Sequence, residues 1–523
     1  DDTGYDVKFF GATAGKYALW DESADSWIIS GTQSTITAGT SNYIAGVNTG
    51  NSIASGGNFN VLVGDEAGTA ITTGDHNVAL GYYALGTEDA HGYNTAIGGR
   101  SLFTLNAGAE GYNTAVGYDS GRLMTTATHN TLIGALAGDS LTTGASNVAV
   151  GYGALTTDDV GQHNVAIGRD ALSALNIATA ANTYNTAVGS SAGAALTTGV
   201  ENTLIGGLAG DALTDADYNV AVGKGSLGTN QLGSRNTAVG TNSLHIANPA
   251  TAVNTYNTAV GYDAGYAITT GVQNTLVGAL AGDALTDADF NVAVGINALT
   301  ADTLGSMSTA IGDNALAAQN FTTATNTYNV GVGISAGKLI TTGQYNTLIG
   351  GEAGDALTTG NQNVAVGYNS LTADTLGDRN VAIGVSTLTA QNFTTTTDAY
   401  NTAVGALAGT AVTTGINNTL IGALAGDALT DADYNVAIGI QALGGDTLGS
   451  RSVAIGSGAL QVQNFTTATN SYNTAIGYDA GNKVSTGTNN TLIGGLAGDS
   501  LTTGSNNVAV GEEALSTDDL GSK

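Results

Sequence analysis

The chain has 523 residues, of which 78 are Gly and 1 is Pro, and only 10% of its residues are charged. Collagen is excluded, because it needs a strict Gly-X-Y period and abundant proline. General disorder is excluded as well, because 42% of the residues are hydrophobic. With a net charge of −30 and only 12 Lys+Arg, the chain cannot neutralise a row of phosphates, so we expect no nucleic-acid partner.

The absence of cysteine removes disulfides and thiolate metal sites. No apolar run approaches the ~18 residues of a membrane span, so we expect no membrane-spanning segment. The opening DDTGYDVKFF has no initiator Met and no apolar signal core, which predicts a processed or truncated start.

Residues 1–35 differ from the rest of the chain. DVKFFGATAGKYALWDESADSWIIS predicts short strands joined by a Gly turn, followed by a hairpin that turns near residues 21–25. So short an aromatic segment cannot bury itself alone, so we expect a small N-terminal β collar, formed by several chains and used for attachment. Its expected core is Phe9, Tyr17, Trp20 and Trp27.

Residues 36–59 contain NYIAG and NSIAS, which we interpret as degraded, capping rungs of the array that follows.

Residues 60–523 repeat the pentad Asn-(Thr/Val)-(Ala/Leu)-(Val/Ile)-Gly, with a few substitutions, at 26 starts between Asn60 and Asn507. From Asn113 onward the spacings are 17, 17, 17 and 21, which gives a 72-residue superperiod. The pentad alternates like a strand, and a unit of this length is too short for a helical hairpin repeat. We therefore predict an all-β parallel β-solenoid shaft with 17-residue rungs. A second short strand is expected at ALTTG or AITTG, and a lengthened loop in every fourth rung.

Asparagine opens 24 of the 26 pentads; Ser308 and Ser452 open the other two. Stacked rungs would bring these amides together in a hydrogen-bonded ladder. The first six expected members in the regular array are Asn113, Asn130, Asn147, Asn164, Asn185 and Asn202.

Position 3 of the pentad is never polar, being Ala in 18 rungs, Leu in 7 and Gly in 1. Positions 2 and 4 are expected inside the coil, so the opposite parity of position 3 places it outside. Two interpretations remain: both faces lie within one broad solenoid, or position 3 is a seam between identical chains. We favour the seam, locked by Leu62, Leu132, Leu204, Leu276, Leu348, Leu420 and Leu492.

The last residues, LGSK, match LGDR at 376–379, which is followed at once by the next pentad. This predicts a shaft that continues beyond residue 523.

The pentads NTAVGYDAG, NVAIG and SVAIG resemble the head repeats of trimeric autotransporter adhesins, and resemble still more the Asn-Thr-Ala-Ile-Gly repeats of bacteriophage tail-fibre proteins. The opening DDTGYDVKFFGATAGKYALWDESAD is similar to a segment of marine phage structural proteins. The resemblance implies three parallel β-rolls side by side in a trimeric fibre. Adhesin heads use a somewhat shorter rung, and no anchor barrel or stalk heptads are present, which favours the phage family.

Chemistry-bearing residues follow the repeat. His76, His129 and His163 precede a pentad Asn where other rungs have Tyr, so we interpret them as aromatic corner residues. The acidic loops GDALTDADY and GDALTDADF lack the spacing of calcium loops and are interpreted as solvated. GSSAG and GISAG match a nucleophile elbow as strings, but GYDAG occupies the same rung position. Regular Thr pairs do not form the Thr-x-Thr face of ice-binding solenoids.

We therefore expect a non-enzymatic structural fibre at the virion surface, with no cofactor and no metal. Its expected partners are two further copies of itself, a virion attachment protein at the N-terminal side, and a host receptor bound through a region outside this chain. The alternative is a bacterial cell-surface adhesin head that binds host or matrix through lateral loops. A polysaccharide-degrading solenoid would require an acidic cluster that breaks the 72-residue pattern.

Overall fold

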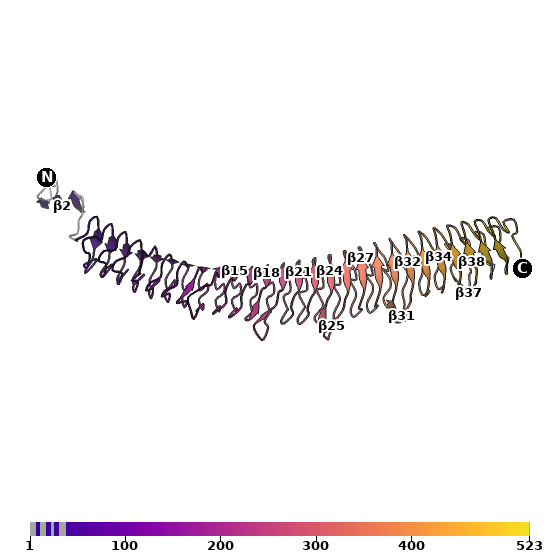
Figure 1. The fold of residues 1–523 in the computed structure, drawn as a ribbon, viewed down its shortest axis with the longest axis horizontal. Helices are drawn as coiled ribbons and strands as arrows, with labels where there is room; N and C mark the ends of the chain where they lie inside the picture. The colour runs from indigo at the N-terminus through magenta and orange to yellow at the C-terminus, as the bar shows by residue number, and fades with distance from the viewer. Residues whose placement is uncertain (1–6, 11–16, 22–25, 31–37, 522–523) are drawn as a thin grey trace, which may run out of the picture. The chain divides into compact units, whose positions relative to one another are not determined.

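The structure is a computed structural model that describes residues 7–10, 17–21, 26–30 and 38–521. It is an all-β parallel β-solenoid of about 28 turns with 17-residue rungs, and the described residues contain no helix. The chain divides into two compact units, Asp1–Tyr218 and Asn219–Lys523. In each unit one short strand per rung stacks on the same strand of the next rung (Figure 1).

The first unit begins with a three-stranded antiparallel sheet of β1 (Val7–Phe10), β2 (Tyr17–Asp21) and β3 (Ser26–Ser30). The register places Trp20 opposite both Val7 and Trp27, and Tyr17 opposite Phe10. These are the strands that the sequence predicts, although turn residues 22–25 lie outside the described residues. The Phe9 side chain is 62% exposed within this chain.

The parallel ladder of the first unit has ten strands of three residues each, paired in register. They are β4 (Tyr43–Ala45), β5 (Val61–Val63), β6 (Val78–Leu80), β7 (Thr95–Ile97), β8 (Thr114–Val116), β9 (Thr131–Ile133), β10 (Val148–Val150), β12 (Val165–Ile167), β14 (Thr186–Val188) and β15 (Thr203–Ile205). NYIAG carries β4, but NSIAS forms the far side of that same turn and is not a rung of its own.

The second unit continues the pattern with 17 strands. They are β16 (Val220–Val222), β18 (Thr237–Val239), β20 (Thr258–Val260), β21 (Thr275–Val277), β22 (Val292–Val294), β24 (Thr309–Ile311), β26 (Val330–Val332), β27 (Thr347–Ile349), β28 (Val364–Val366), β30 (Val381–Ile383), β32 (Thr402–Val404), β33 (Thr419–Ile421), β34 (Val436–Ile438), β36 (Val453–Ile455), β38 (Thr474–Ile476), β39 (Thr491–Ile493) and β40 (Val508–Val510).

The Gly that closes each pentad is required by both conformation and space. Gly134 has φ 135°, which side chains rarely adopt. A Cβ built on it would lie 2.4 Å from the carbonyl oxygen of Gly151 in the next rung. The stacked closing glycines therefore let successive backbones approach closely enough for the strand pairing to continue.

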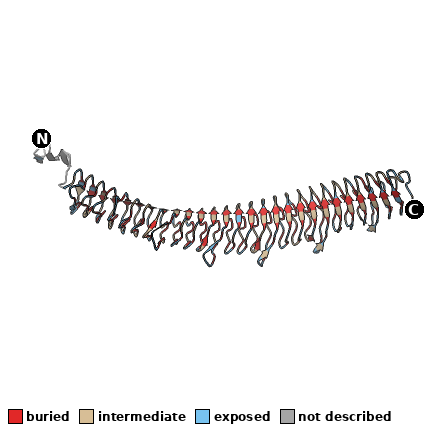
Figure 2. Ribbon diagram, viewed as in Figure 1, coloured by how far each residue is buried: buried red, intermediate tan, exposed pale blue. Residues whose placement is uncertain are grey.

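Position 3 of the pentad points into the coil, which corrects the expected inside-outside parity. All seven position-3 leucines, from Leu62 to Leu492, are 0% exposed within a single chain. Figure 2 shows buried residues at the centre of the stacked strands. From β5 onward each three-residue strand has its middle residue buried and its flanking residues more exposed, as in β27 and β30. The leucines therefore cannot be the seam between chains, because the coil of one chain already encloses them.

The 72-residue spacing of these leucines follows from core packing. Counting the pentad Asn as first, the ninth residue is, from Asn113 onward, Gly in two consecutive rungs and Leu in the next two. A Cβ on Gly193 would lie 2.7 Å from Cδ1 of Leu204 and 2.9 Å from Cδ2 of Leu172. Rungs with Ala at position 3 and Leu at position 9, such as the rung of Ala149 and Leu155, fill the same space from the other wall. Leucines at position 3 and leucines at position 9 therefore fill the same close-packed core from opposite sides of the coil.

The four-residue insertion of every fourth rung forms structure of its own. Five two-residue parallel pairs join it to the rung before, and β25, β31 and β37 lie on one side of their coils in Figure 1. The pairs are β11 (Gly161–Gln162) with β13 (Ala181–Asn182), β17 (Gly233–Ser234) with β19 (Val253–Asn254), β23 (Gly305–Ser306) with β25 (Thr325–Asn326), β29 (Gly377–Asp378) with β31 (Thr397–Asp398), and β35 (Gly449–Ser450) with β37 (Thr469–Asn470).

The expectation of a second strand at ALTTG or AITTG is wrong, because these segments are turns. Their backbone groups bond to the neighbouring rung one at a time, as in the matching turn where Thr125 N–H donates to Thr142 O at 2.9 Å.

Candidate functional site

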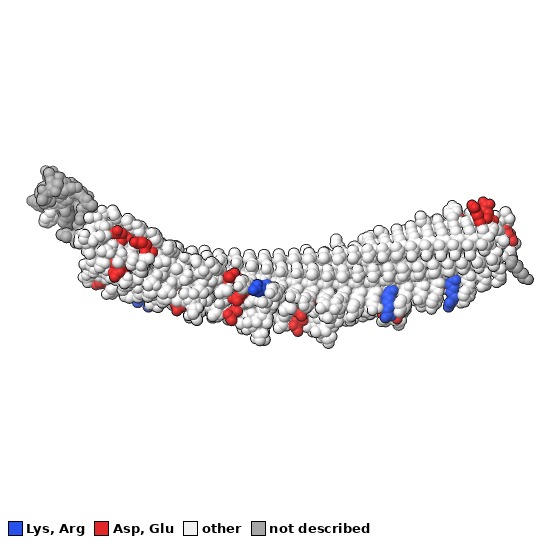
Figure 3. Space-filling view, viewed as in Figure 1, with Lys and Arg blue, Asp and Glu red and all other residues white. Residues whose placement is uncertain are grey.

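The outward face of the parallel ladder is formed by pentad positions 2 and 4. In the second unit every residue at these positions is Thr, Val or Ile. Position 4 is half-buried in most strands of the second unit and more exposed in others, as at Ile349 (39%), Ile383 (38%) and Ile421 (37%). Most of the surface visible in Figure 3 is likewise free of charge, although the chain carries −30. We call positions 2 and 4 of all ladder strands the outer face.

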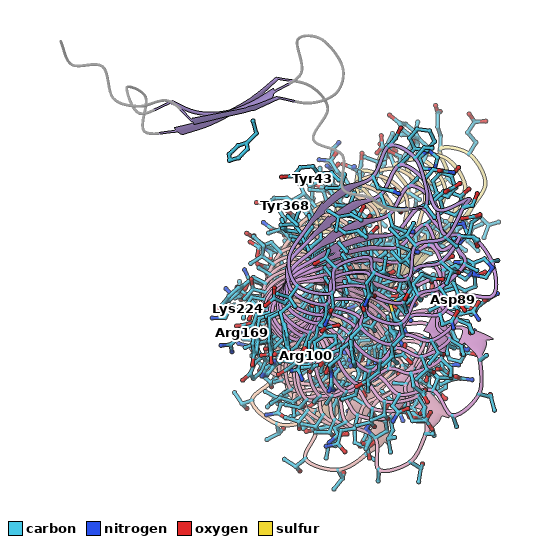
Figure 4. The ribbon with its side chains drawn as sticks, turned by 90° about the vertical axis from the view of Figure 1, so that its left-hand side faces the viewer. Tyr43, Asp89, Arg100, Arg169, Lys224 and Tyr368 are labelled. Atoms are coloured by element: carbon cyan, nitrogen blue, oxygen red, sulfur yellow. The ribbon has the colours of Figure 1, made fainter. Side chains whose placement is uncertain are left out.

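A third column borders the outer face, at the residue after each closing Gly. Large apolar side chains recur there with about 55–64% exposure, as at Tyr262, Ile296, Ile334 and Tyr368. Small residues stand between many of them, and the Tyr368 ring covers Gly351, where an added Cβ would lie 3.5 Å from the ring. Tyr368 is at the side of the coil in Figure 4. The border of the outer face is therefore a row of knobs separated by gaps.

Positions 2 and 4 carry no cation, although Arg169 and Lys224 stand in the bordering column, directly after closing glycines. In the second unit Arg379 pairs with Asp398 and lies 5.4 Å from the ring centroid of Tyr400, while Arg451 lies 4.7 Å from that of Tyr434. These pairs join rungs at the corner before the pentad Asn. The outer face itself offers shape and apolar surface rather than charge.

The asparagines form the expected ladder inside the coil. The Oδ1 atom of each accepts the backbone N–H of the next: Asn113 from Asn130 at 3.0 Å, Asn130 from Asn147 at 2.9 Å, and Asn147 from Asn164 at 2.9 Å. In the same way, Asn164 accepts the N–H of Asn185 at 3.2 Å, and Asn185 accepts the N–H of Asn202 at 3.0 Å. The Nδ2 atom of Asn130 also donates to the Gly144 carbonyl at 3.0 Å. Each amide thus joins two rungs, and all six are buried.

The residue before each pentad Asn forms an exposed aromatic column. His76 stacks between Phe59 and Tyr93, with ring centroids 4.9 Å away on each side. His129 stacks on Tyr112 at 5.3 Å, and His163 stacks on Tyr184 at 5.1 Å. The three histidines therefore are aromatic corner residues, as the sequence predicts.

Position 12 of the rung carries a buried polar network that sequence reasoning missed. In three superrepeats a buried Asp is paired with a buried Gln, as in Gln319 Nε2 to Asp302 Oδ2 at 2.5 Å. Gln319 also donates to the Ser308 hydroxyl at 2.7 Å and accepts from Asn329 at 2.9 Å. The signal in the sequence was the recurrence of this Asp and of a Gln at the same position of the next rung.

Asp158 occupies the same place without the Gln, because Leu175 stands there. Burial raises the pKa of the Asp158 carboxyl to about 6, while the Gly161 N–H, at 3.0 Å, and two other backbone bonds oppose the rise. In a further copy Asn230 replaces the Asp and satisfies Gly233 through both its amide atoms, at 2.8 and 2.9 Å.

The acidic loops and the Gly-x-Ser-x-Gly strings have structural roles in the repeat. The acidic loop residues cap the preceding rung, with Thr198 Oγ1 donating to Asp215 at 2.6 Å and Val200 N–H to Asp217 at 2.8 Å. Ser191 of GSSAG has φ 56° and Asp263 of GYDAG has φ 51°, so both strings form the same ordinary turn of the repeat.

Comparisons with known proteins give no relative: no protein-family model, no curated protein and no solved structure matches this chain. In the part of the chain that the structure describes, no helix is both long and apolar enough to cross a membrane.

Proposed function

We propose that this chain is the shaft of a homotrimeric fibre on the surface of a phage virion, which holds a receptor-binding region away from the particle for host attachment. The observation that carries the proposal is the outer face. Monomeric proteins rarely leave an apolar patch larger than a few hundred Å² uncovered. A face of β-branched side chains repeated through 17 strands of one unit calls for a cover, and further copies of the chain offer the same repeat in the same register.

The trimer and the phage assignment both rest on the resemblance of the pentads to fibre and adhesin repeats. Three solenoids that face one another through positions 2 and 4 would bury the Val and Ile columns. The knobs and gaps of the bordering column would then interlock along the seam. The seam is thus moved from position 3 to the opposite face of the same strand.

The mechanism is mechanical. Each rung is stabilised mainly by its neighbours, so the shaft gains length by copying a rung without a new core. A threefold assembly presents three receptor-binding regions at once, which raises avidity without strong single contacts. No chemical step is assigned to the shaft.

The test is the mass of the chain in solution by native mass spectrometry. We expect three times 51.6 kDa, and a stable mass of 51.6 kDa at micromolar concentration would overturn the assembly. The double variant Ile349→Lys/Ile421→Lys places charge on the outer face and should lower the mass to that of one chain. The matched control Tyr472→Arg, at a corner where Arg379 and Arg451 already stand, should keep the wild-type mass.

A second candidate is an adhesin that binds laterally, favoured by one break in the repeat. Gly444 and Gly445 replace Thr372 and Ala373 of the preceding superrepeat. They open a cavity of about 530 Å³, also lined by Asp427, Gln441, Gln461, Val462 and Asn464. A secretion signal and a membrane anchor encoded in the same gene would favour this candidate, whereas an attachment domain without them would favour the virion fibre.

A further inference from the structure

Two side chains of the first unit depart from the repeat at one turn. His91 stands where Gly161, Gly233 and Gly305 stand in the corresponding rungs. Glu88 stands where those rungs have Asp or Asn, three residues earlier. A rung that only needed to close its turn would keep Gly, as the others do. The His therefore calls for an explanation that the repeat does not provide.

The ligand atoms of Glu88, Asp89 and His91 all lie within 4.8 Å of one another. Nδ1 of His91 lies 3.6 Å from Oε1 of Glu88, which is too far for a hydrogen bond. It is close to the separation of about 3.4 Å expected for two ligands that share one tetrahedral metal ion with bonds of about 2.1 Å. The geometry therefore suits a shared cation better than a direct contact.

The side chains also have unused capacity at this point. Nδ1 of His91 is buried and has no hydrogen-bond partner. Glu88 is 0% exposed. Its Oε1 atom accepts the backbone N–H of His91 at 3.2 Å, and its Oε2 atom accepts the backbone N–H of Ala107 at 3.1 Å. Each carboxylate oxygen can accept a second interaction. Two backbone donors thus fix the carboxylate and leave lone pairs available to an ion.

The surroundings are negative. Glu110 accepts the Gly92 N–H at 2.8 Å, next to the cluster. Within the described residues, no Lys or Arg forms an ion pair with Glu88 or Asp89. In Figure 4 Asp89 lies on the opposite side of the first unit's coil from Arg169, away from the outer face.

We propose that Glu88, Asp89 and His91 bind a divalent transition-metal ion, with Zn²⁺ as the best fit. One imidazole nitrogen with two carboxylates is a ligand set that Zn²⁺ accepts, and water can complete the tetrahedron. The backbone carbonyl of Asp89 also accepts the Thr72 N–H at 2.6 Å, and Glu88 reaches Ala107 in the next rung. The ion therefore ties neighbouring rungs together near the start of the ladder.

The test is a calorimetric titration of the chelator-treated full chain with Zn²⁺. We expect one site per chain that His91→Gly weakens at least ~10-fold, since loss of a group that merely supports a ligand already costs about that much. His91→Gly should fold, because Gly fills this position in the corresponding rungs, and its circular dichroism should match wild type. Glu88→Asn, which places at this turn the residue type of Asn230, should also lose the site.

The control is His129→Tyr, which changes a His of the aromatic column to the residue type found at Tyr112. It should bind Zn²⁺ like the wild type. The proposal is overturned if the wild-type chain takes up no Zn²⁺. It is equally overturned if His91→Gly binds with the wild-type stoichiometry and affinity, because the ion would then lie elsewhere.

Discussion

At the scale of single residues, the repeated copies act as each other's controls. Position 12 is Asp paired with Gln in three superrepeats, Asp beside Leu in another, and Asn in a further one. Asp302 receives a hydrogen bond from Gln319, whereas Asp158 faces Leu175 and has its pKa raised to about 6 by burial. Burial also raises the pKa of Asp374, although a hydrogen bond from Gln391 opposes the rise. The same backbone turn is therefore closed by side chains with different hydrogen-bond partners.

Asp158→Asn should stabilise its rung at pH 8. The folded state keeps the Asp158 proton up to its raised pKa of about 6, whereas the unfolded chain loses it near the ordinary pKa of 3.8. Stability from this group is therefore fully present below about pH 4 and is lost as the pH rises to about 6. We expect a gain of about 1–3 kcal/mol for the variant above pH 7 and little change below pH 4.

Amide hydrogen exchange of residues 158–177 measures this effect locally, which suits an array that need not unfold in one step. The reverse variant Asn230→Asp should introduce the same pH dependence in the second unit. Equal protection of wild type and Asp158→Asn at pH 8 would contradict the argument.

Asn130→Ala should open the asparagine ladder. It removes the acceptor of the Asn147 N–H and the donor to the Gly144 carbonyl, and both groups are buried. Leaving two such groups unpaired costs about 2–4 kcal/mol. Limited proteolysis should cut near residues 128–147 in this variant and not in Thr131→Val, which changes an outward position to a residue found in other rungs. Wild-type resistance of Asn130→Ala would show that water replaces the amide.

At the scale of the rung, the core is a shared volume. Leu204 fills the space above Gly193 and Gly210, whose added Cβ atoms would lie 2.7–2.8 Å from its methyl groups. Leu172, in the rung before Gly193, fills the equivalent space from the ninth position with φ 49°. Leucine is thus accepted in a left-handed conformation wherever the packing needs its volume.

We therefore expect that a leucine at position 9 can partly replace a leucine at position 3. Leu204→Ala should cost about 2–5 kcal/mol by leaving a cavity. Gly193→Leu alone should destabilise by overpacking. The double variant should recover part of both losses, with a coupling above about 1 kcal/mol in a double-mutant cycle read by exchange protection. Additive effects would show that the two positions do not share one space.

At the scale of the whole molecule, charge and apolar surface oppose each other. The chain carries −30, yet positions 2 and 4 are free of charge. Chains that meet through the outer face keep most of their charges at the periphery, where repulsion reaches about 10 Å at 0.1 M salt and about 30 Å at 0.01 M. Repulsion between chains therefore grows as salt is removed.

Assembly should weaken as ionic strength falls. Sedimentation at 0.3 M and 0.01 M salt should show a larger share of single chains at the lower concentration, since the apolar seam offers no ion pairs to compensate. The charged variant Ile349→Lys/Ile421→Lys should stay monomeric at both. Dissociation by added salt would instead indicate a seam of ion pairs and would contradict the outer face as the contact.

The sequence alone determined the class of fold, the rung length, the strand register, the asparagine ladder and the aromatic column. Each depends on hydrogen bonds or stacking between equivalent residues, which the 17-residue period fixes directly.

Only the tertiary structure decided which face of the pentad is inside. Alternation separates two faces but cannot tell core from surface when both are apolar. Leu at position 3 and Val or Ile at position 4 have similar hydrophobicity, and the choice depends on the opposite wall, where glycines leave the space that the leucines fill. The structure also brought Glu88, Asp89 and His91 together and moved the candidate seam to positions 2 and 4.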